Sequence, residues 1–209
     1  METFQIESNE YLKTPIEAWY HSDYHNGGRW RQDGTIENII CTLKNDIRIK
    51  PANDVDLLNA RQRLYDILYE DLKIMKYYHE LYSITPLTIC VVPRAKVNYM
   101  PHQLLFKTTI RQVVVALDLN DGTDYIIRTV DTRTTHRNRS GFGGNGMLPY
   151  VGITRDTCAI SEEVRGKDVL LIDDVYTRTI NIDEDAIQTL LDNGANSVLF
   201  YSIGRTTQM

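Results

Sequence analysis

The chain has 209 residues, 42% of them hydrophobic, and a formal net charge of -5, which is enough apolar material for one full core and an additional element. The acidic balance argues against a general nucleic-acid binder and leaves only local basic clusters for such a role. The polar amino terminus lacks the features of a signal peptide, and no apolar run approaches the length of a membrane span.

Cys41, Cys90 and Cys158 are far apart, and each lies in or beside an apolar run. This arrangement predicts buried free thiols rather than a disulfide framework or a zinc site. A reducing environment suits such thiols, so a cytoplasmic location is expected.

Residues 1–83 are expected to form an accessory region that ends at the turn Ser83-Ile-Thr-Pro86. Apolar residues recur every three or four positions from about 54 to 82, which predicts one long amphipathic helix. Asn53 or Asp54 is suited to cap its start. The stretch from Ile36 to Leu43 is compatible with a strand or a short helix.

His21 and His25 are four residues apart beside Asp23, in a segment rich in aromatic and arginine residues. Such a spacing can hold a metal, although packing or surface roles are more common for histidines of this kind. A surface that stacks on a base or contacts a partner chain is a third interpretation.

The second part of the chain, 84–209, opens with a predicted strand from Leu87 to Val92, and the loop after it carries Arg94 and Lys96. A helix is expected from about His102 to Leu117 with Pro101 at its start. A second strand is expected from Tyr125 to Thr129.

A basic run follows in this acidic chain, with Arg128, Arg133, His136, Arg137 and Arg139. Gly141 to Gly146 then matches the pattern G-x-G-x-x-G, but it neither follows a strand nor precedes a helix, so dinucleotide binding is rejected. A long segment rich in glycine and charge predicts a mobile lid. Contact with nucleic-acid phosphates is the alternative for the same arginines.

The most informative stretch runs from Val169 to Asn181, where an apolar strand ends in Asp173-Asp174 and a hydroxyl-rich turn. We expect a strand over Asp168–Ile172, a turn over Thr177–Asn181, a helix over about Ile182–Asp192 that stops at Asn193-Gly194, and a strand over Ser197–Ser202.

Open parallel sheets bind ligands at the carboxyl ends of their strands, where the Asp173-Asp174 pair falls. A turn that leads into a helix offers free N–H groups to anions. The two carboxylates can hold vicinal hydroxyls, directly or through a hydrated metal. Together these features predict a ribose-phosphate site, while the plainer interpretation is that the acids only close a strand and cap a helix.

The run Val169-Leu-Leu-Ile-Asp-Asp-Val-Tyr-Thr177 resembles the phosphoribosyl pyrophosphate (PRPP) motif of type I phosphoribosyltransferases. The similarity extends toward their competence-protein F-like (ComF, amidophosphoribosyltransferase-related) branch through Glu163–Asp168 and Gly194–Thr206. It implies an α/β fold with a mostly parallel sheet of four or five strands flanked by helices, preceded by an amino-terminal helical hood.

The resemblance also implies roles for individual residues. Asp173 and Asp174 would hold the ribose hydroxyls and help to place Mg²⁺, directly or indirectly, when PRPP is bound. Arg94 and Lys96 would face the pyrophosphate, unless they are solvated loop charges. The remaining roles are phosphate binding by Thr177, Arg178, Thr179, Ile180 and Asn181, and a lid that carries Arg133, His136, Arg137 and Arg139.

The phosphate loop departs from the family pattern, which after the acids is Val-x-Thr-Thr-Gly-x-Thr. Arg178 stands for a threonine, Thr179 for the glycine, and Asn181 for the last hydroxyl residue. Glycine tolerates backbone angles that cost a β-branched residue about 1 kcal/mol or more, so another loop shape or another ligand is expected. Arg178 can add a phosphate contact or fill the space of the phosphate.

The implied activity is transfer of a phosphoribosyl group from PRPP to an acceptor that no residue identifies, whether a base, ammonia or a macromolecule. One alternative is a catalytically inactive sensor or subunit that binds PRPP or a nucleotide. Another is an effector or accessory protein of a nucleic-acid-handling complex, such as an anti-phage system of the retron type, in which the arginine run and the aromatic amino terminus make contacts. A protein partner or homo-oligomer is compatible with each of these, and a membrane partner is not expected.

Overall fold

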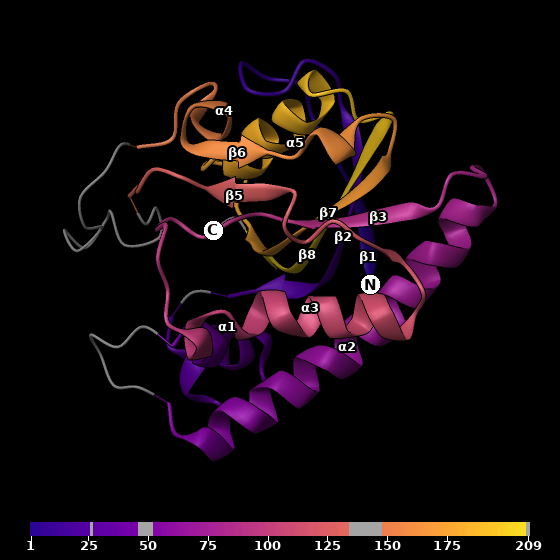
Figure 1. Ribbon diagram of the computed structural model, residues 1–209. Helices are drawn as coiled ribbons and strands as arrows, with labels where there is room; N and C mark the ends of the chain where they lie inside the picture. Colours follow the sequence, from indigo (N-terminus) through magenta and orange to yellow (C-terminus); the bar gives the residue numbers. More distant parts are fainter. Residues whose placement is uncertain (26, 46–51, 134–147, 208–209) are drawn as a thin grey trace.

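The computed structural model describes residues 1–25, 27–45, 52–133 and 148–207. Its centre is a six-stranded sheet in the order β1-β2-β8-β7-β3-β4 (Figure 1). Every neighbouring pair is parallel except the edge pair β1 and β2. The strands are β1 (Glu2–Ile6), β2 (Ile16–Tyr24), β3 (Leu87–Val91), β4 (Asn120–Asp121), β7 (Asp168–Tyr176) and β8 (Ser197–Thr206).

Helices cover both faces of this sheet, which confirms the α/β class with a mostly parallel sheet (Figure 1). One face carries α1 (Ile36–Lys44), α2 (Asp54–Glu80) and α3 (Leu105–Ala116), and the other carries the short α4 (Ile153–Thr157) and α5 (Ile182–Asp192). The apolar side chains of β7 divide between two cores. Leu170 and Ile172 pack with α1–α3, and Val169 and Leu171 pack with α5.

The sheet has six strands rather than the expected four or five, because residues 1–24 supply two of them. In β2, Trp19 and Tyr20 are buried, and the strand pairs in parallel with β8. These aromatic side chains therefore pack in the core instead of forming a surface for a base. Hydrophobic periodicity alone did not reveal β1 and β2, since their polar residues alternate irregularly with apolar ones.

The helices of the amino-terminal half follow the sequence pattern closely. Residues 36–44 form α1, capped by Thr35, whose side chain accepts a hydrogen bond from Asn38 N. The long helix is α2, and its cap is Asn53, whose side chain accepts from Asp56 N at 2.8 Å. The helix expected at about 102–117 begins as a 3-10 turn over Pro101–Gln103 and continues as α3.

The strand expected at Tyr125–Thr129 is β5 (Ile126–Arg128), but it lies outside the main sheet. It pairs antiparallel with β6 (Cys158–Ile160). The neighbour of β3 is instead β4, which follows α3 directly and has only two residues. Gly122 N extends this edge by donating to Ile89 O at 3.0 Å.

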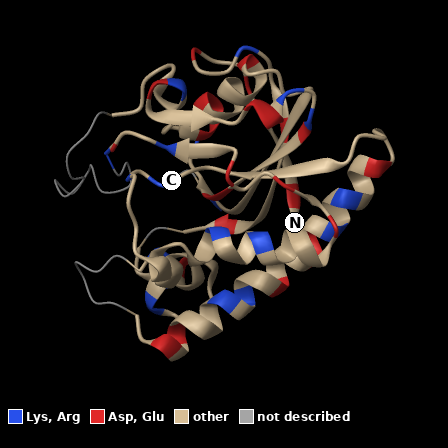
Figure 2. Cartoon of the chain, viewed as in Figure 1, with Lys and Arg blue, Asp and Glu red and all other residues tan. Residues whose placement is uncertain are grey.

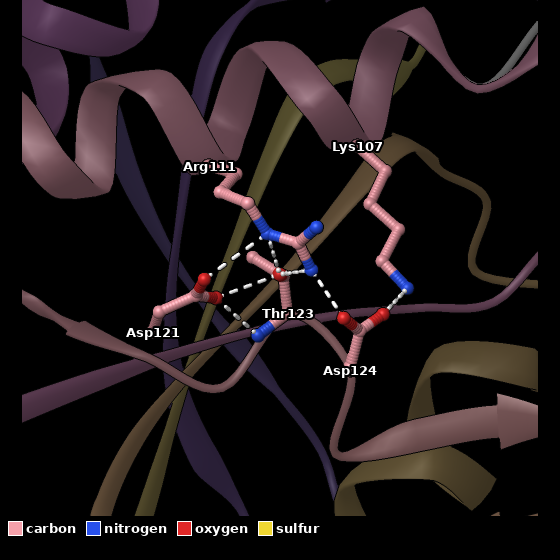
Figure 3. A network of polar contacts seen from close by, with 5 residues as sticks. All are labelled: Lys107, Arg111, Asp121, Thr123 and Asp124. Carbon is pink, nitrogen blue, oxygen red and sulfur yellow. Dashed lines mark hydrogen bonds and ion pairs between the residues drawn. The ribbon is translucent and has the colours of Figure 1, made fainter. Parts of the chain in front are cut away.

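A polar network holds β4 against α3 (Figure 3). Arg111 Nε donates to Asp121 Oδ2 at 3.0 Å, and Arg111 Nη2 donates to Thr123 Oγ1 at 2.7 Å. Asp124 pairs with both Arg111 and Lys107. The two cations lie one turn apart on α3, so the helix side chains select which short segment becomes the edge of the sheet.

The elements around the acidic motif match the expectation most closely. The helix α5 spans the predicted residues, and Gly194 follows it with φ 93°, a left-handed angle that suits glycine. Both neighbouring strands, β7 and β8, extend four residues beyond their predicted ends. The cysteines are free, with Cys90 and Cys158 buried. In the described ranges, no helix combines the length and the apolar character that a bilayer span requires.

Candidate functional site

The two carboxylates lie where β7 runs past the end of β3. Val92 N donates to Ile172 O at 2.9 Å, and beyond this bond β7 is paired only with β8 on the other side. Asp173 is level with Ser202 of β8. The structure therefore places the acidic pair at the carboxyl edge of the sheet, the position at which open parallel sheets bind ligands.

Successive side chains of a strand point to opposite faces, and the contacts of the two acids follow this rule. Asp174 contacts Lys44 at the end of α1, with 2.9 Å between Nζ and Oδ2. Asp173 faces Asp183, in the first turn of α5. The acids thus belong to two different environments on either side of the sheet.

The Lys44 environment is dominated by opposite charge. Burial lowers the pKa of Lys44, but attraction to Asp174, with a further contribution from Asp173, outweighs this and leaves the pKa above its ordinary value. The ammonium is therefore fixed in its charged form beside Asp174. Any ligand hydroxyl that bonds this carboxylate must share it with Lys44.

The environment of Asp173 is the reverse, because two carboxyl groups face each other. Burial and the charge of Asp174 raise the pKa of Asp173 to about 7. Burial and the charge of Asp173 raise the pKa of Asp183 well above its usual range. At neutral pH at least one proton therefore resides on this pair.

Unpaired polar atoms surround the Asp173 side of the site. Ser202 Oγ, Thr177 Oγ1 and Asp183 Oδ1 are buried and have no hydrogen-bond partner in the described part of the chain. Buried polar groups in folded proteins are nearly always bonded, and exceptions concentrate where a ligand or water completes them. Ser202 is level with Asp173 and Asp183 faces it, so their free atoms are suited to bond hydroxyl or water oxygens.

The turn between β7 and α5 keeps free donors. Ile180 N donates to Thr177 O at 3.0 Å, whereas the backbone N–H groups of Arg178, Thr179 and Asn181 make no hydrogen bond with the residues that the structure describes. Arg178 is exposed. Such a turn offers N–H groups to an anion, as the sequence predicts.

Thr179, which stands where the motif that the chain resembles has a glycine, carries no left-handed strain. Within the turn the only described residue with positive φ is Asn181, at 58°. Asparagine adopts this region more readily than other residues with a side chain. The left-handed position of this turn therefore falls at Asn181, two residues after Thr179.

The first turn of α5 is crowded with acids, since Asp183, Glu184 and Asp185 are all buried. Asp185 accepts hydrogen bonds from the backbone N–H groups of Gly152 and Thr154, which ties α4 to α5. Glu184 accepts from Tyr176 OH at 2.9 Å. Carboxylates at a helix amino terminus offset its partial positive charge, so α5 attracts an external phosphate less than an uncapped helix would.

Arg94 and Lys96 follow β3 and so lie at the same edge of the sheet as the acids. Their side chains are occupied by contacts within the protein. Arg94 donates to Gln103 O at 2.6 Å and stacks over Tyr99, 4.2 Å from its ring centre. Lys96 Nζ donates to Thr132 O at 2.8 Å. Pyrophosphate binding by this pair remains a prediction, and it requires these contacts to be exchanged.

The residues of the basic run do not share one environment. Arg128 is buried and donates to Arg94 O and to Thr157 Oγ1, so this arginine joins the loop after β3 to the end of α4 instead of facing a nucleic acid. Arg133 is described and partly buried. His136, Arg137 and Arg139 lie outside the described residues, as does the glycine-rich stretch 141–146, and their lid role remains a prediction.

The histidine pair does not converge on a metal site. His21 Nδ1 lies 2.8 Å from Asp71 Oδ2, and the same oxygen accepts a hydrogen bond from Tyr201 OH at 2.7 Å. His25 Nδ1 lies 3.3 Å from Thr207 Oγ1. Across the described ranges, no three His, Cys, Asp or Glu side chains come together in a metal-binding arrangement.

Comparisons with known proteins give a distant likeness only. No family model and no curated protein matches the chain. It is similar to a hypoxanthine-guanine phosphoribosyltransferase from L. donovani, with 11% identity, a TM-score of 0.40, and coverage of 68% of this chain and 71% of that one. It is also similar to a hypoxanthine phosphoribosyltransferase from Staphylococcus aureus, with 13% identity, a TM-score of 0.37, and coverage of 71% and 75%. At such scores neither likeness decides what this chain binds.

The sequence pattern missed three residues of the site. Lys44 closes a helix and Asp183 opens one, positions at which a cation and an acid are ordinary. Their contacts therefore leave no local signal. Ser202 could have been predicted from the sequence, because a small polar residue at the end of the strand beside β7 is expected to lie level with the acids.

Proposed function

We propose that the carboxyl end of β7 binds the ribosyl part of a ribose phosphate. Among such ligands, PRPP would use all parts of the proposed site. The observation that supports this most is the acidic pair level with Ser202, beside a turn with free N–H groups. Carboxylates accept hydrogen bonds from vicinal hydroxyls, and the turn donates to phosphate oxygens. Asp174 and Asp173 hold the ribose, and Thr177 to Asn181 hold the phosphate.

Mg²⁺ is expected to arrive with the ligand. Lys44 already occupies Asp174, and no closed set of metal ligands is present in the described ranges. The acids are therefore suited to contact a hydrated ion held by pyrophosphate oxygens and not to bind the bare metal. If the protein turns PRPP over, its contribution is to position the ribose and neutralise the departing pyrophosphate, with Arg94 and Lys96 as the cations.

Binding without turnover is the second candidate. One feature favours it: Arg94 and Lys96 are held by contacts with Gln103 O and Thr132 O. These contacts reduce the positive charge available to a leaving pyrophosphate. In this role the protein senses PRPP or a nucleotide.

Calorimetry with PRPP and Mg²⁺ tests the ribose site. The comparison is between the native protein, the double variant Asp173→Asn/Asp174→Asn, and the control Asp192→Asn. Asp192 is a carboxylate at the far end of α5 that pairs with Lys13 at the surface. We expect binding by the native protein and the control and its loss in the double variant, with folding checked by circular dichroism.

Pyrophosphate release, measured in the presence of candidate bases, separates the two candidates. Release supports transfer, and binding without release supports a sensor. No heat of binding at millimolar PRPP, or equal binding by the double variant, would remove the ribose site from consideration.

A further inference from the structure

The long helix α2 has a second face that nothing in the described part of the chain covers. Its core side is fully buried, with Leu64, Leu68 and Leu72 at 0% exposure. Its outer side forms part of the surface of the helical layer (Figure 1). Large apolar side chains on α2 and at its end are nevertheless exposed, namely Val55 at 66%, Leu58 at 65%, Ile74 at 54%, Tyr77 at 66%, Leu81 at 58% and Tyr82 at 76%.

Four of them, Val55, Leu58, Tyr77 and Leu81, lie on one line along the helix. Steps of three and four residues keep side chains on the same face. Such steps connect Val55, Leu58, Gln62, Asp66, Tyr69, Lys73, Tyr77 and Leu81. The outer line is therefore apolar at both ends, and its middle holds Gln62, Asp66 and Lys73 beside Tyr69, which is half-buried against the core. The apolar ends are placed nearly alike when the line is read in either direction.

A line of this kind matches itself in the antiparallel direction. When two copies lie side by side with opposite directions, Leu58 of each faces Tyr77 of the other, and Val55 faces Leu81. Gln62 then faces Lys73. The exposed apolar ends of both helices are covered at once, without any other partner.

The charges in the middle of the line agree with the same arrangement. Gln62 Nε2 donates to Asp66 Oδ1 at 2.8 Å, so this carboxylate lies next to the position that faces Lys73. Lys73 is exposed and makes no ion pair within the described part of the chain. Figure 2 shows both signs of charge along α2. Antiparallel pairing places the two Asp66 carboxylates near the two-fold axis and Lys73 of each copy one turn from Asp66 of the other, so the two lysines offset the two acids.

We infer that the outer face of α2 binds a second copy of this chain, helix against antiparallel helix. Such a contact is isologous and closes with two-fold symmetry, so it produces a dimer and not a filament. A strip about 40 Å long and about 10 Å wide is about 400 Å² on each partner, at the weak end of protein interfaces. The dimer is therefore expected to depend on concentration.

Disulfide cross-linking tests the geometry. The double variant Leu58→Cys/Tyr77→Cys is expected to form a covalent dimer on mild oxidation, because the two positions face each other across the interface. The single variant Leu58→Cys is the matched control, since in the antiparallel arrangement its two copies lie far apart. Cross-linking of the single variant as fast as the double variant would overturn the inference, as would a double variant that stays monomeric.

Charge reversal tests the ion pairs. These variants keep Leu58 and Tyr77, so no cysteine is introduced. Sedimentation is expected to show that Asp66→Lys alone and Lys73→Asp alone each weaken the dimer at least about threefold, since like charges then face each other. The combination Asp66→Lys/Lys73→Asp restores opposite charges and is expected to recover the dimer. A native protein that is monomeric at every accessible concentration, or a combination as weak as the singles, would contradict the proposal.

Discussion

Lys44 Nζ lies 2.9 Å from Asp174 Oδ2, and this contact joins the end of α1 to the end of β7. The exposed fractions of the two side chains are 33% and 18%, so the pair is only partly hydrated. Asp174 is also a proposed contact of the ribose. The same carboxylate therefore serves both the ion pair that joins α1 to β7 and the bound ligand. A cation from the amino-terminal half thereby completes a site built by the second half of the chain.

Replacing Lys44 by methionine removes this charge while keeping most of the side-chain volume. We expect a loss of about 1–3 kcal/mol in the free energy of unfolding, because a partly buried carboxylate loses its partner. The pKa of Asp173 should also rise, since Lys44 is one of the charges that lower it. Urea denaturation measures the first effect. The control is Lys13→Met, whose ion pair with Asp192 is at the surface and should contribute little. Equal losses in the two variants would contradict the prediction.

The facing pair Asp173 and Asp183 predicts that stability changes with pH. The pKa of Asp173 in the folded protein is about 7, above the value of about 3.9 expected for an unfolded aspartate. Between these pH values the folded state binds more protons than the unfolded state. The contribution of the Asp173 carboxyl to the free energy of unfolding is therefore complete below pH 4 and is lost as the pH rises to 7. Asp183 acts in the same direction. Asp183→Asn keeps the shape but removes one titrating group, so its stability should fall less between pH 5 and pH 7.

Urea midpoints at a series of pH values measure this slope. Asp192→Asn is the control, because the pKa of Asp192 is lowered and its own contribution is lost only toward acidic pH. A native slope that Asp183→Asn leaves unchanged would mean that the two carboxyl groups do not share a proton.

Asp168 anchors the opposite, amino-terminal edge of the sheet. It accepts hydrogen bonds from Ser83 Oγ at 2.6 Å, Asn196 Nδ2 at 2.6 Å and Ser197 Oγ at 2.7 Å. Burial raises its pKa, but these bonds and His79 outweigh that effect, so the pKa is lowered. Asp168→Asn is expected to cost about 2–3 kcal/mol in a chemical denaturation experiment, because the charged acceptor of several donors is lost. Ser83→Ala removes a single donor and should cost about 1 kcal/mol, and a larger loss in this variant would refute the assignment.

Gly122 lies where β4 meets β3, and no side chain fits there. A Cβ would come within 2.8 Å of Thr88 Cγ2 and 3.0 Å of Cys90 Sγ. Gly122→Ala is expected to destabilise the protein by about 1–3 kcal/mol through overpacking, as measured by thermal or urea unfolding. Gly166→Ala is the comparison. A Cβ there meets nothing within 4 Å, and only the backbone angle of +70° opposes it. The Gly122 variant should be the less stable of the two.

Local patterns predicted the elements whose signals lie within a few residues of one another. The spacing of apolar residues predicted α2, and the turn before α5 together with the glycine stop after it predicted α5 at its observed bounds. The strands β1 and β2 were not predicted, because their place depends on pairing with β8, far away in the chain. The sequence also placed β5 wrongly in the main sheet, for a similar reason. The contacts of Arg111 hold β4 at the edge position beside β3, and they are not visible in a local pattern.

The candidate site also combines features that a local pattern predicts with features that depend on distant parts of the chain. The run of apolar residues before Asp173 and Asp174 was sufficient to predict that both acids lie at the carboxyl end of a central strand. Their separation toward α1 and α5 depends on Lys44 and Asp183, and these contacts arise only when the layers pack. Patterns within one segment place functional groups along the chain, whereas their charge state depends on the groups that other segments bring to them.

The position of β8 between β2 and β7 has a consequence for biosynthesis. During translation, β2 leaves the ribosome long before its partner β8, and until then it can pair only with β1. The nascent chain therefore carries an open strand edge, and unpaired edges are prone to join other chains. We expect assembly of the sheet to wait for the last strand, so ribosome-bound chains that end before residue 197 should be more sensitive to protease, and bind chaperones more, than chains that include β8.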